Sequence, residues 1–178
     1  AVKDETERLA KHGIRAGLAL VLVGEDRSSY MYYQAIQNAA VRAGIDIFNH
    51  AMPPAVTLNE LLNLIKTLNN DERVNGILMF MPLPKHIDTR KVVNAIAPEK
   101  DVDGLGAISV GRLSADESTV QLFAPGNTFS VRSTFLPCTP YGVMRLLEHY
   151  GIDPRGKKAV VVGKSLAVGK PLAMMLLV

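Results

Sequence analysis

The chain has 178 residues, of which 48% are hydrophobic and 21% are charged. This composition is typical of a globular protein that buries a core of its own and needs no disulfide or metal staple. The net charge of +3 is small, and the basic residues are scattered rather than interleaved with aromatic ones, which argues against nucleic-acid binding. No apolar run reaches the roughly 18 residues of a membrane helix. The single cysteine, Cys138, excludes an internal disulfide and favours a reducing, cytoplasmic compartment.

Strands and helices are expected to alternate from Gly17 onward. Residues 18–23 are continuously apolar, which predicts a buried strand of a parallel sheet. Ser28 or Ser29 can cap a helix that Gly44 would end. Residues 45–50 form a short second strand in this prediction.

Two further helices are predicted around a third strand. Thr57 and Glu60 have the spacing of a capping box, which opens a helix with apolar residues at helical spacing. Residues 76–81 are apolar and predict a strand that the prolines of 82–84 would end. Asp88 can cap the next helix. Strands separated by helices of this length indicate an α/β fold with a parallel sheet and right-handed crossovers.

The pattern changes after residue 104. Residues 104–136 are rich in Gly, Ser and Thr and lack a helical period, which predicts a long loop or an irregular hairpin. A helix is expected from Thr139 to about Gly151. We place a domain boundary at its start, so residues 1–138 form the first domain and residues 139–178 begin the second.

The last residues predict a strand, a glycine turn and a helix. Residues 158–162 predict the strand, because residues 159–162 are apolar without alternation. Residues 163–169 contain two glycines, and Lys170 opens the helix. A glycine turn before a helix N-terminus favours an anion. Lys158 stands where a P-loop needs glycine, so the turn is either a modified dinucleotide turn or a plain connection. Because the first residue is Ala1 and the pattern stops at Val178, we expect further sequence beyond both ends of the chain.

Other candidate sites have plainer alternatives. Tyr32 and Ile36 share one face of a helix, either as part of the core or as part of a site. Asp101 and Asp103 lack the further ligands that a metal needs, so polar recognition or an Asp-Gly turn explains them better. Cys138 has no paired histidine, which argues against a nucleophile.

Taken in order, these segments form a series of motifs. They are Val23–Asp26, Ser29–Tyr32, Gly76–Leu78, Pro82–Pro84, Lys100–Gly104, Val110–Leu113, Pro137–Pro140 and Val168–Pro171. Together they resemble the methylenetetrahydrofolate dehydrogenase/cyclohydrolase family over nearly the whole chain.

The resemblance implies a two-domain α/β protein with a folate cleft between a substrate domain and a Rossmann-like NAD or NADP domain. It also implies oxidation of 5,10-methylenetetrahydrofolate by a homodimer without a metal. Tyr32 would pack against the pterin-side rings and Asp103 would hydrogen-bond the pterin. The remaining implied substrate residues are Met79, Phe80, Met81 and Pro82. The implied cofactor residues are Thr139, Gly163, Lys164, Ser165, Val168 and Gly169.

The chain departs from the family pattern at two positions of the catalytic centre. The family usually has lysine where this chain has Ile36, and glutamine where it has Phe80. Neither replacement can move a proton or orient a water molecule. The hypothesis is therefore a dehydrogenase with weak or absent cyclohydrolase activity. The alternatives are a bifunctional enzyme with rearranged proton transfer and a non-catalytic folate- or nucleotide-binding protein.

Two further departures lie in the second half. Residues 114–135 are longer than the usual family loop. Lys164 replaces the common arginine. The lysine ammonium binds a phosphate as a point charge, whereas an arginine guanidinium can donate two parallel hydrogen bonds to it. NAD and NADP both remain open.

Overall fold

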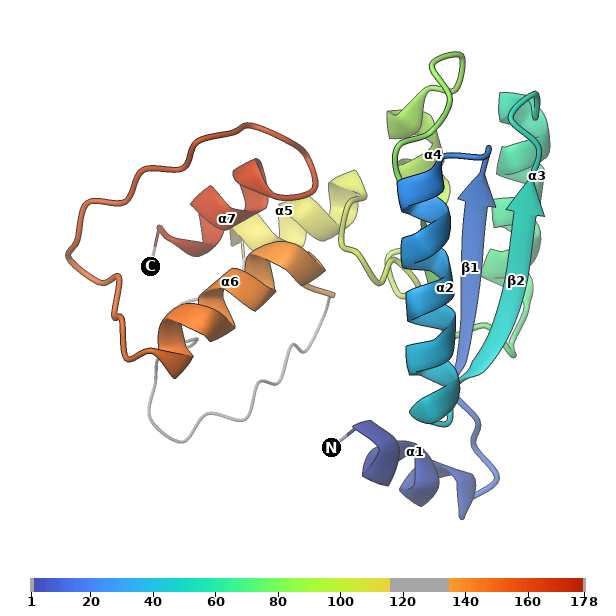
Figure 1. Ribbon diagram of the computed structural model, residues 1–178, viewed down its shortest axis with the longest axis horizontal. Helices are drawn as coiled ribbons and strands as arrows, with labels where there is room; N and C mark the ends of the chain where they lie inside the picture. The colour runs from blue at the N-terminus through green and yellow to red at the C-terminus, as the bar shows by residue number, and fades with distance from the viewer. Residues whose placement is uncertain (1, 116–134, 178) are drawn as a thin grey trace. The chain divides into compact units, whose positions relative to one another are not determined.

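The structure is a computed structural model that describes residues 2–115 and 135–177. The chain divides into two compact units, Ala1–Lys100 and Asp101–Val178, and each is described by itself. The first unit contains α1 (Val2–Ala10), β1 (Gly17–Val23), α2 (Arg27–Arg42), β2 (Asp46–Met52), α3 (Leu58–Asn70), β3 (Gly76–Met79) and α4 (Thr89–Ala95). The second contains α5 (Ala107–Ala115), α6 (Cys138–His149) and α7 (Gly169–Met175) (Figure 1).

The sheet of the first unit is parallel and has the order β2-β1-β3. The central strand β1 is apolar on both faces, and Val21 pairs with His50 on one side and Met79 on the other. The three predicted strands of this unit are confirmed. β3 ends at Met79 rather than at Met81, although the Phe80 amide still donates to Val21 O at 2.9 Å.

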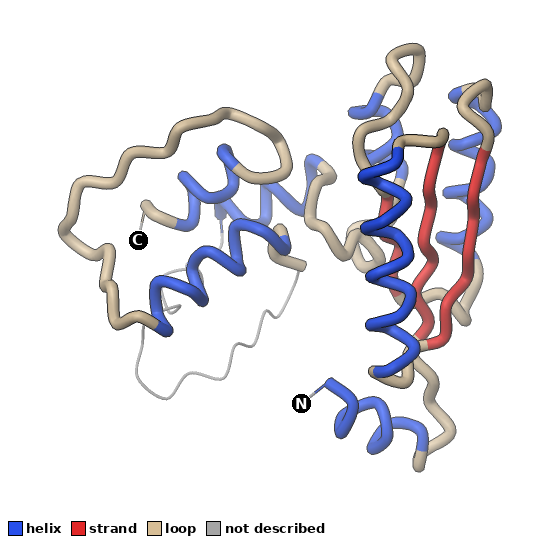
Figure 2. The backbone as a smooth tube through the Cα atoms, in the orientation of Figure 1, coloured by secondary structure: helices blue, strands red, loops and turns tan. Residues whose placement is uncertain are grey.

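Helices cover both faces of this sheet, as Figures 1 and 2 show. One face packs its apolar residues against α3 and α4 in the main core, which includes Val21, Leu61, Ile65 and Val92. The other face lies against α2, whose inward side includes the buried Tyr33. This arrangement follows from a strand that is apolar on both faces and must be covered twice.

Side-chain caps fix the starts of α2, α3 and α4. The capping box of Thr57 and Glu60 and the Asp88 cap are confirmed. The helix predicted here forms as α2, but the predicted serine cap was wrong, because Asp26 is the N-cap and accepts from the Ser29 amide at 2.8 Å. A carboxylate accepts this bond better than a hydroxyl, and the Ser28 hydroxyl itself donates to Asp26.

The second unit is a small helical cluster. Leu113 from α5, Met144 from α6 and Met175 from α7 are buried against one another. The helix predicted from Thr139 to Gly151 is confirmed as α6. The prediction of a loop or hairpin over 104–136 was wrong in its first part, because α5 forms there. Residues 116–134 lie outside the described residues.

The strand predicted at residues 158–162 does not form. Val160 and Val162 are 87% and 97% exposed, and their residues are in an irregular segment. A strand obtains its backbone hydrogen bonds only from a neighbouring strand. Within residues 101–115 and 135–177 no such neighbour exists, so the apolar sequence alone does not produce a strand.

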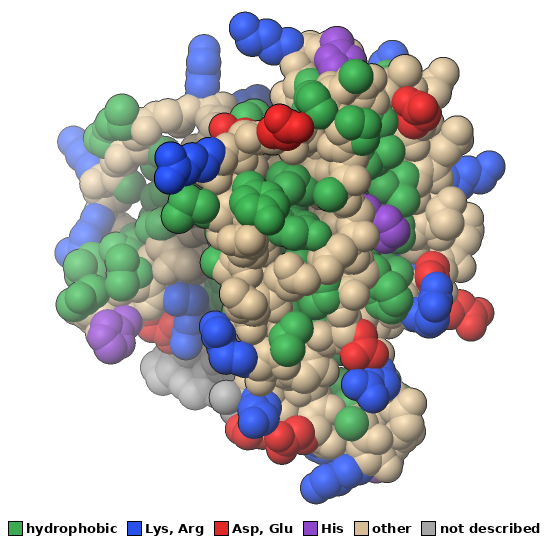
Figure 3. Space-filling view, turned by 45° about the vertical axis from the view of Figure 1, so that its right-hand side comes forward, with side chains coloured by type: hydrophobic (Ala, Val, Ile, Leu, Met, Phe, Trp, Pro, Cys, Tyr) green, Lys and Arg blue, Asp and Glu red, His purple; other side chains and the backbone are tan. Residues whose placement is uncertain are grey.

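Charged side chains are spread over the surface. On the face drawn in Figure 3, Lys and Arg residues are scattered and Asp and Glu residues lie among them. Pairs such as Arg15 with Asp46 and Arg155 with Asp153 neutralise one another locally. Across the described part of the chain, no helix combines the length and hydrophobicity needed to cross a membrane.

Candidate functional site

An aromatic cluster lies at the carboxyl end of β3. The Phe80 ring contacts Tyr32 at 5.6 Å between centroids and Tyr33 at 5.3 Å, with interplanar angles of 68° and 66°. Both are the edge-to-face arrangements that aromatic rings prefer. Phe80 is only 3% exposed, whereas Tyr32 is 56% exposed. The cluster therefore presents one tyrosine to the surface and holds it against a buried ring.

The other predicted site residues of the first unit lie on α2 or at the end of β3. Ile36 is half-buried one helical turn after Tyr32 on α2. Met79 is buried, Met81 is half-buried and Pro82 is exposed. The carboxyl end of a parallel strand is where open sheets bind ligands, so these side chains stand in a suitable place.

Two residues to which the sequence assigned no role in a site support this cluster. Tyr33 is 8% exposed, stacks on Tyr30 at 6.3 Å and has its pKa raised by burial. Ser29 is buried, and its hydroxyl donates to Met81 O at 3.1 Å, which ties α2 to the end of β3. The spacing of Ser29 and Tyr33, four apart on the inward face of the helix, was the available signal.

In the second unit, a buried carboxylate organises the turn that carries Asp103. Asp101 is 2% exposed and accepts from the Gly106 amide at 2.9 Å, the Leu105 amide at 3.3 Å and the Ser109 hydroxyl at 2.7 Å. These donors lie at the beginning of α5, where backbone amides need acceptors. Asp101 thus has a structural partner set, and the described residues contain no cluster of metal-ligating side chains.

Asp103 follows on this turn and contacts Cys138. Burial raises the pKa of the Asp103 carboxyl, and this effect outweighs the lowering by the neighbouring Cys138 thiol; the charge of Asp101 raises it further. The single proton of the Cys138 thiol is directed to Val102 O, at 3.5 Å from the sulfur. Partial burial of the sulfur, together with the Asp103 charge, raises the pKa of Cys138 to about 11. Cys138 is therefore a protonated donor, which agrees with the sequence argument against a nucleophile.

The glycine turn closes on itself before α7. A Cβ at Gly169 would lie 2.3 Å from Gly163 O, so no other residue fits there. The Ser165 hydroxyl accepts from the Val168 and Gly169 amides, both at 3.2 Å. Gly163 has a φ of +133° and open space beside its Cα, and the Lys164 side chain is exposed. These two features fit a phosphate-bearing cofactor, while Ser165 holds the turn. Thr139 is exposed at the beginning of α6.

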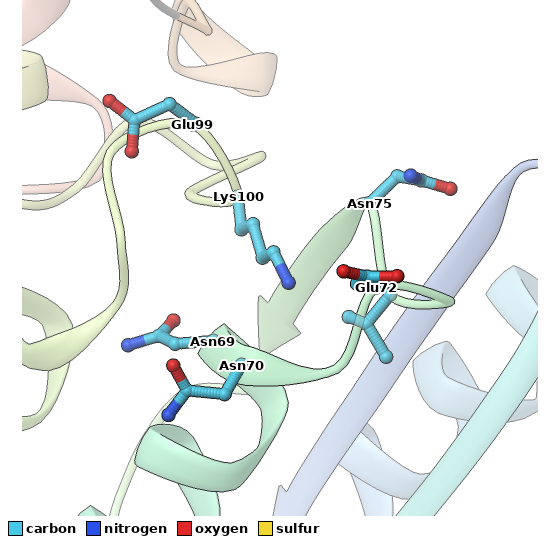
Figure 4. A pocket seen from close by; sticks show the side chains of 7 residues that line it. Asn69, Asn70, Glu72, Asn75, Glu99 and Lys100 are labelled. Carbon is cyan, nitrogen blue, oxygen red and sulfur yellow. The ribbon is translucent and has the colours of Figure 1, made fainter.

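A separate depression of about 590 Å³ lies at the end of α3 in the first unit. Figure 4 shows Lys100 extending toward that helix end. Its ammonium donates to Leu68 O at 3.0 Å and Asp71 O at 2.8 Å. The Asn69 side chain bonds both Ala95 O and the Ala97 amide. These groups hold the fold together, and no predicted site residue lines the depression.

The structure thus brings Tyr32 and Phe80 into contact and places Asp103 beside Cys138. Each pair lies inside one compact unit.

Comparison with known proteins gives the family. The model of the tetrahydrofolate dehydrogenase/cyclohydrolase catalytic domain matches residues 1–103, and that of the family's NAD(P)-binding domain matches residues 137–178. The chain belongs to this family. The α/β fold with a parallel sheet in an N-terminal catalytic domain, followed by an NAD(P)-binding domain, is thereby confirmed.

Several relatives are similar over the whole of this chain. The bifunctional protein FolD of Moorella thermoacetica is 49% identical over 176 residues, which cover 99% of this chain and 58% of that protein. The FolD crystal structure from Campylobacter jejuni has a TM-score of 0.87 and 41% identity, covering 99% of this chain and 57% of that one. The Trypanosoma brucei enzyme in complex with NADP and an inhibitor has a TM-score of 0.83 and 30% identity, covering 99% and 56%. The chain spans somewhat more than half the length of these relatives.

Proposed function

We propose that this chain acts in the oxidation of 5,10-methylenetetrahydrofolate to 5,10-methenyltetrahydrofolate, with weak or absent cyclohydrolase activity. Family membership and the relatives' dehydrogenase function support the first part. Within it, residues 1–138 serve folate binding and residues 139–178 begin the NAD(P)-binding domain. NAD or NADP supplies the acceptor for the hydride when it is bound.

The observation that carries the second part is the environment of Phe80. Its buried ring fills the space between Tyr32 and Tyr33. The family's usual glutamine would offer an amide at this position, and its usual lysine at Ile36 would offer a proton carrier. Phenylalanine and isoleucine supply neither the amide nor the proton carrier at these two positions.

The chemistry of hydride transfer tolerates such a wall. Hydride transfer needs oriented reactants and exclusion of water, and an apolar surface provides both. The exposed Tyr32 ring packs against the pterin-side rings, and its contact with the buried Phe80 ring fixes its position. Asp103 accepts hydrogen bonds from the pterin N–H groups, and Met79, Met81 and Pro82 add apolar contacts. Lys164 meets the cofactor phosphates near Gly163, with Thr139, Ser165, Val168 and Gly169 completing that site.

Restoring the two polar residues tests the proposal. The purified full-length protein should reduce NAD or NADP with 5,10-methylenetetrahydrofolate and should not accelerate hydrolysis of the methenyl compound. The double variant Ile36→Lys with Phe80→Gln should accelerate that hydrolysis at least tenfold, since positioned proton transfer contributes about 10²–10⁴-fold. Met31→Lys is the matched control, because it adds a lysine to the exposed side of the same helix.

Two results separate the alternatives, and a third measurement tests the oligomeric state. Rapid hydrolysis by the unaltered chain would contradict the proposal and favour a bifunctional enzyme. Binding of folate and cofactor without any reduction would favour a non-catalytic binding protein. Sedimentation of the same sample tests the homodimer that the family resemblance implies.

A further inference from the structure

The buried Phe80 ring is held by two residues that are adjacent in the sequence of α2. Its backbone is fixed to the sheet, because the Phe80 amide donates to Val21 O at 2.9 Å. Its ring contacts Tyr32 and Tyr33 with centroid distances of 5.6 Å and 5.3 Å and at similar interplanar angles, 68° and 66°. One of these tyrosines is exposed and the other is buried, so the outer ring and the inner ring share Phe80 as their common neighbour.

The inner tyrosine, Tyr33, contacts a second ring as well. It is stacked on Tyr30, with centroids 6.3 Å apart and planes at 20° to one another. Tyr30 lies about one turn earlier on α2 and is half exposed, so it covers Tyr33 from the solvent side. Tyr33 thus packs against Tyr30 and Phe80 at once, and these contacts restrict the orientation of its ring.

The rotation of α2 about its own axis determines where Tyr32 points. Successive residues of an α-helix are about 100° apart, so a helix that turns position 33 toward the sheet presents position 32 to one side of it. Two inward residues fix this rotation. The Tyr33 ring packs against Phe80, and the Ser29 hydroxyl, one turn earlier, donates to Met81 O at 3.1 Å. Two consecutive residues after β3 are therefore in contact with two consecutive inward positions of α2.

We propose that Tyr33 is a positioning residue for Tyr32, because it holds the Phe80 ring against which Tyr32 packs. The inference rests on the proposed function, in which the Tyr32 ring packs against the pterin-side rings. Aromatic rings attract one another only in a limited set of tilts and distances. A Tyr32 ring that is already held at one orientation loses less conformational freedom when the substrate binds. Tyr33 is buried and acts through Phe80, without touching the folate itself.

The first experiment uses the folate and the full-length protein. Tyr33→Leu removes the ring and keeps a buried apolar side chain. It should raise the KM for 5,10-methylenetetrahydrofolate about fivefold with kcat nearly unchanged, because binding weakens equally in the ground state and the transition state. Tyr33→Phe should retain the original KM, since the ring and not the hydroxyl makes the contact. Tyr150→Leu, the same substitution at a tyrosine that is 69% exposed, is the control.

Two results of this experiment would overturn the inference. A Tyr33→Leu variant that loses thermal stability but keeps its KM would show a purely structural role. A Tyr33→Phe variant that behaves like Tyr33→Leu would assign the effect to the hydroxyl. If Tyr33→Leu does not fold, Tyr33→Met takes its place with the same expected KM, because the unbranched methionine adapts to an irregular space.

The second experiment needs no folate and therefore separates this inference from the proposed function. In full-length protein with isotope-labelled Phe and Tyr, the nuclear Overhauser effect between the Tyr32 and Phe80 rings is measured without substrate. It should be retained in Tyr33→Phe and should fall at least twofold in Tyr33→Leu or Tyr33→Met. Equal intensities in all variants would overturn the inference, whatever the activity. A loss of intensity in a protein that does not reduce NAD or NADP would support the placement of Tyr32 by Tyr33 and contradict only the proposed function.

Discussion

Two apolar segments of this chain have nearly the same sequence character and different structures. Residues 18–23 form the centre of a three-stranded sheet and are buried on both faces. Residues 158–162 are also rich in valine, yet Val160 and Val162 are almost fully exposed. The difference lies in their surroundings, because β1 has a partner strand on each side. An apolar run gives a segment the capacity to form a strand, and neighbouring strands decide whether it does.

The largest expected change in unfolding free energy comes from a core substitution in the first unit, compared with a surface substitution on the same helix. Ile65→Ala removes a fully buried side chain from the cluster beneath β1 and should lower the free energy of unfolding by about 2–5 kcal/mol. Lys66→Ala, the exposed neighbour on the same helix, should change it by less than about 0.5 kcal/mol. Urea unfolding of both variants measures this difference. Equal losses would mean that the core of the first unit is not the one described.

The next prediction tests the two valine-rich segments directly. Val21→Thr places a hydroxyl in the centre of the sheet and should cost about 1–3 kcal/mol of unfolding free energy. Val162→Thr is the same substitution at a side chain that is 97% exposed, and it should cost less than about 0.5 kcal/mol. Thermal unfolding measures both. A comparable cost at Val162 would show that residues 158–162 are buried in solution.

A smaller effect is expected at the capping box. The Thr57 hydroxyl accepts from the Glu60 amide, and the Glu60 carboxylate accepts from the Thr57 amide and hydroxyl. Thr57→Ala removes the hydroxyl and should destabilise the first unit by about 1 kcal/mol. Thr67→Ala, an exposed position on the same helix, is the control. If the two variants unfold at the same urea concentration, the cap contributes nothing.

As pH falls, the Asp103 carboxylate of the second unit should become protonated before the Asp71 carboxylate of the first unit. Burial raises the pKa of Asp103, whereas the hydrogen bonds from Arg73 lower the pKa of Asp71 to about 2. As pH falls from 7, Asp103 therefore protonates while Asp71 is still ionised. The stabilisation from Asp71 is complete above its ordinary pKa of 3.8 and is lost only as pH falls toward 2. A ¹³C titration of both carboxyl carbons checks the order, and the reverse order would contradict it.

Much of this chain could be predicted from sequence where the interaction is local. The Thr57–Glu60 box and the Asp88 cap depend on groups within three residues, so their spacing alone identifies them. The continuous apolar run at 18–23 predicted a doubly covered strand. The motif series, rather than any single residue, indicated the family that the comparisons confirm.

The tertiary structure decided what depends on distant partners. Phe80 lies between Tyr32 and Tyr33 because α2 is tied to the end of β3 through Ser29 and Met81. The sequence assigned Tyr32 and Phe80 to the site, but it could not predict that their rings contact each other or that Tyr33 also packs against Phe80. Likewise, α5 was missed because its beginning is held by the buried Asp101 rather than by a helical apolar period.

The sequence by itself therefore determined the caps of α3 and α4, the central strand and the motifs, since these rest on spacing within a few residues. Only the tertiary structure decided that Phe80 is enclosed by tyrosines, that Cys138 faces Asp103 and that residues 158–162 remain outside a sheet. Each of these depends on groups brought together from far apart in the chain. The free energy of such contacts comes from packing and desolvation, which no local pattern of residues contains.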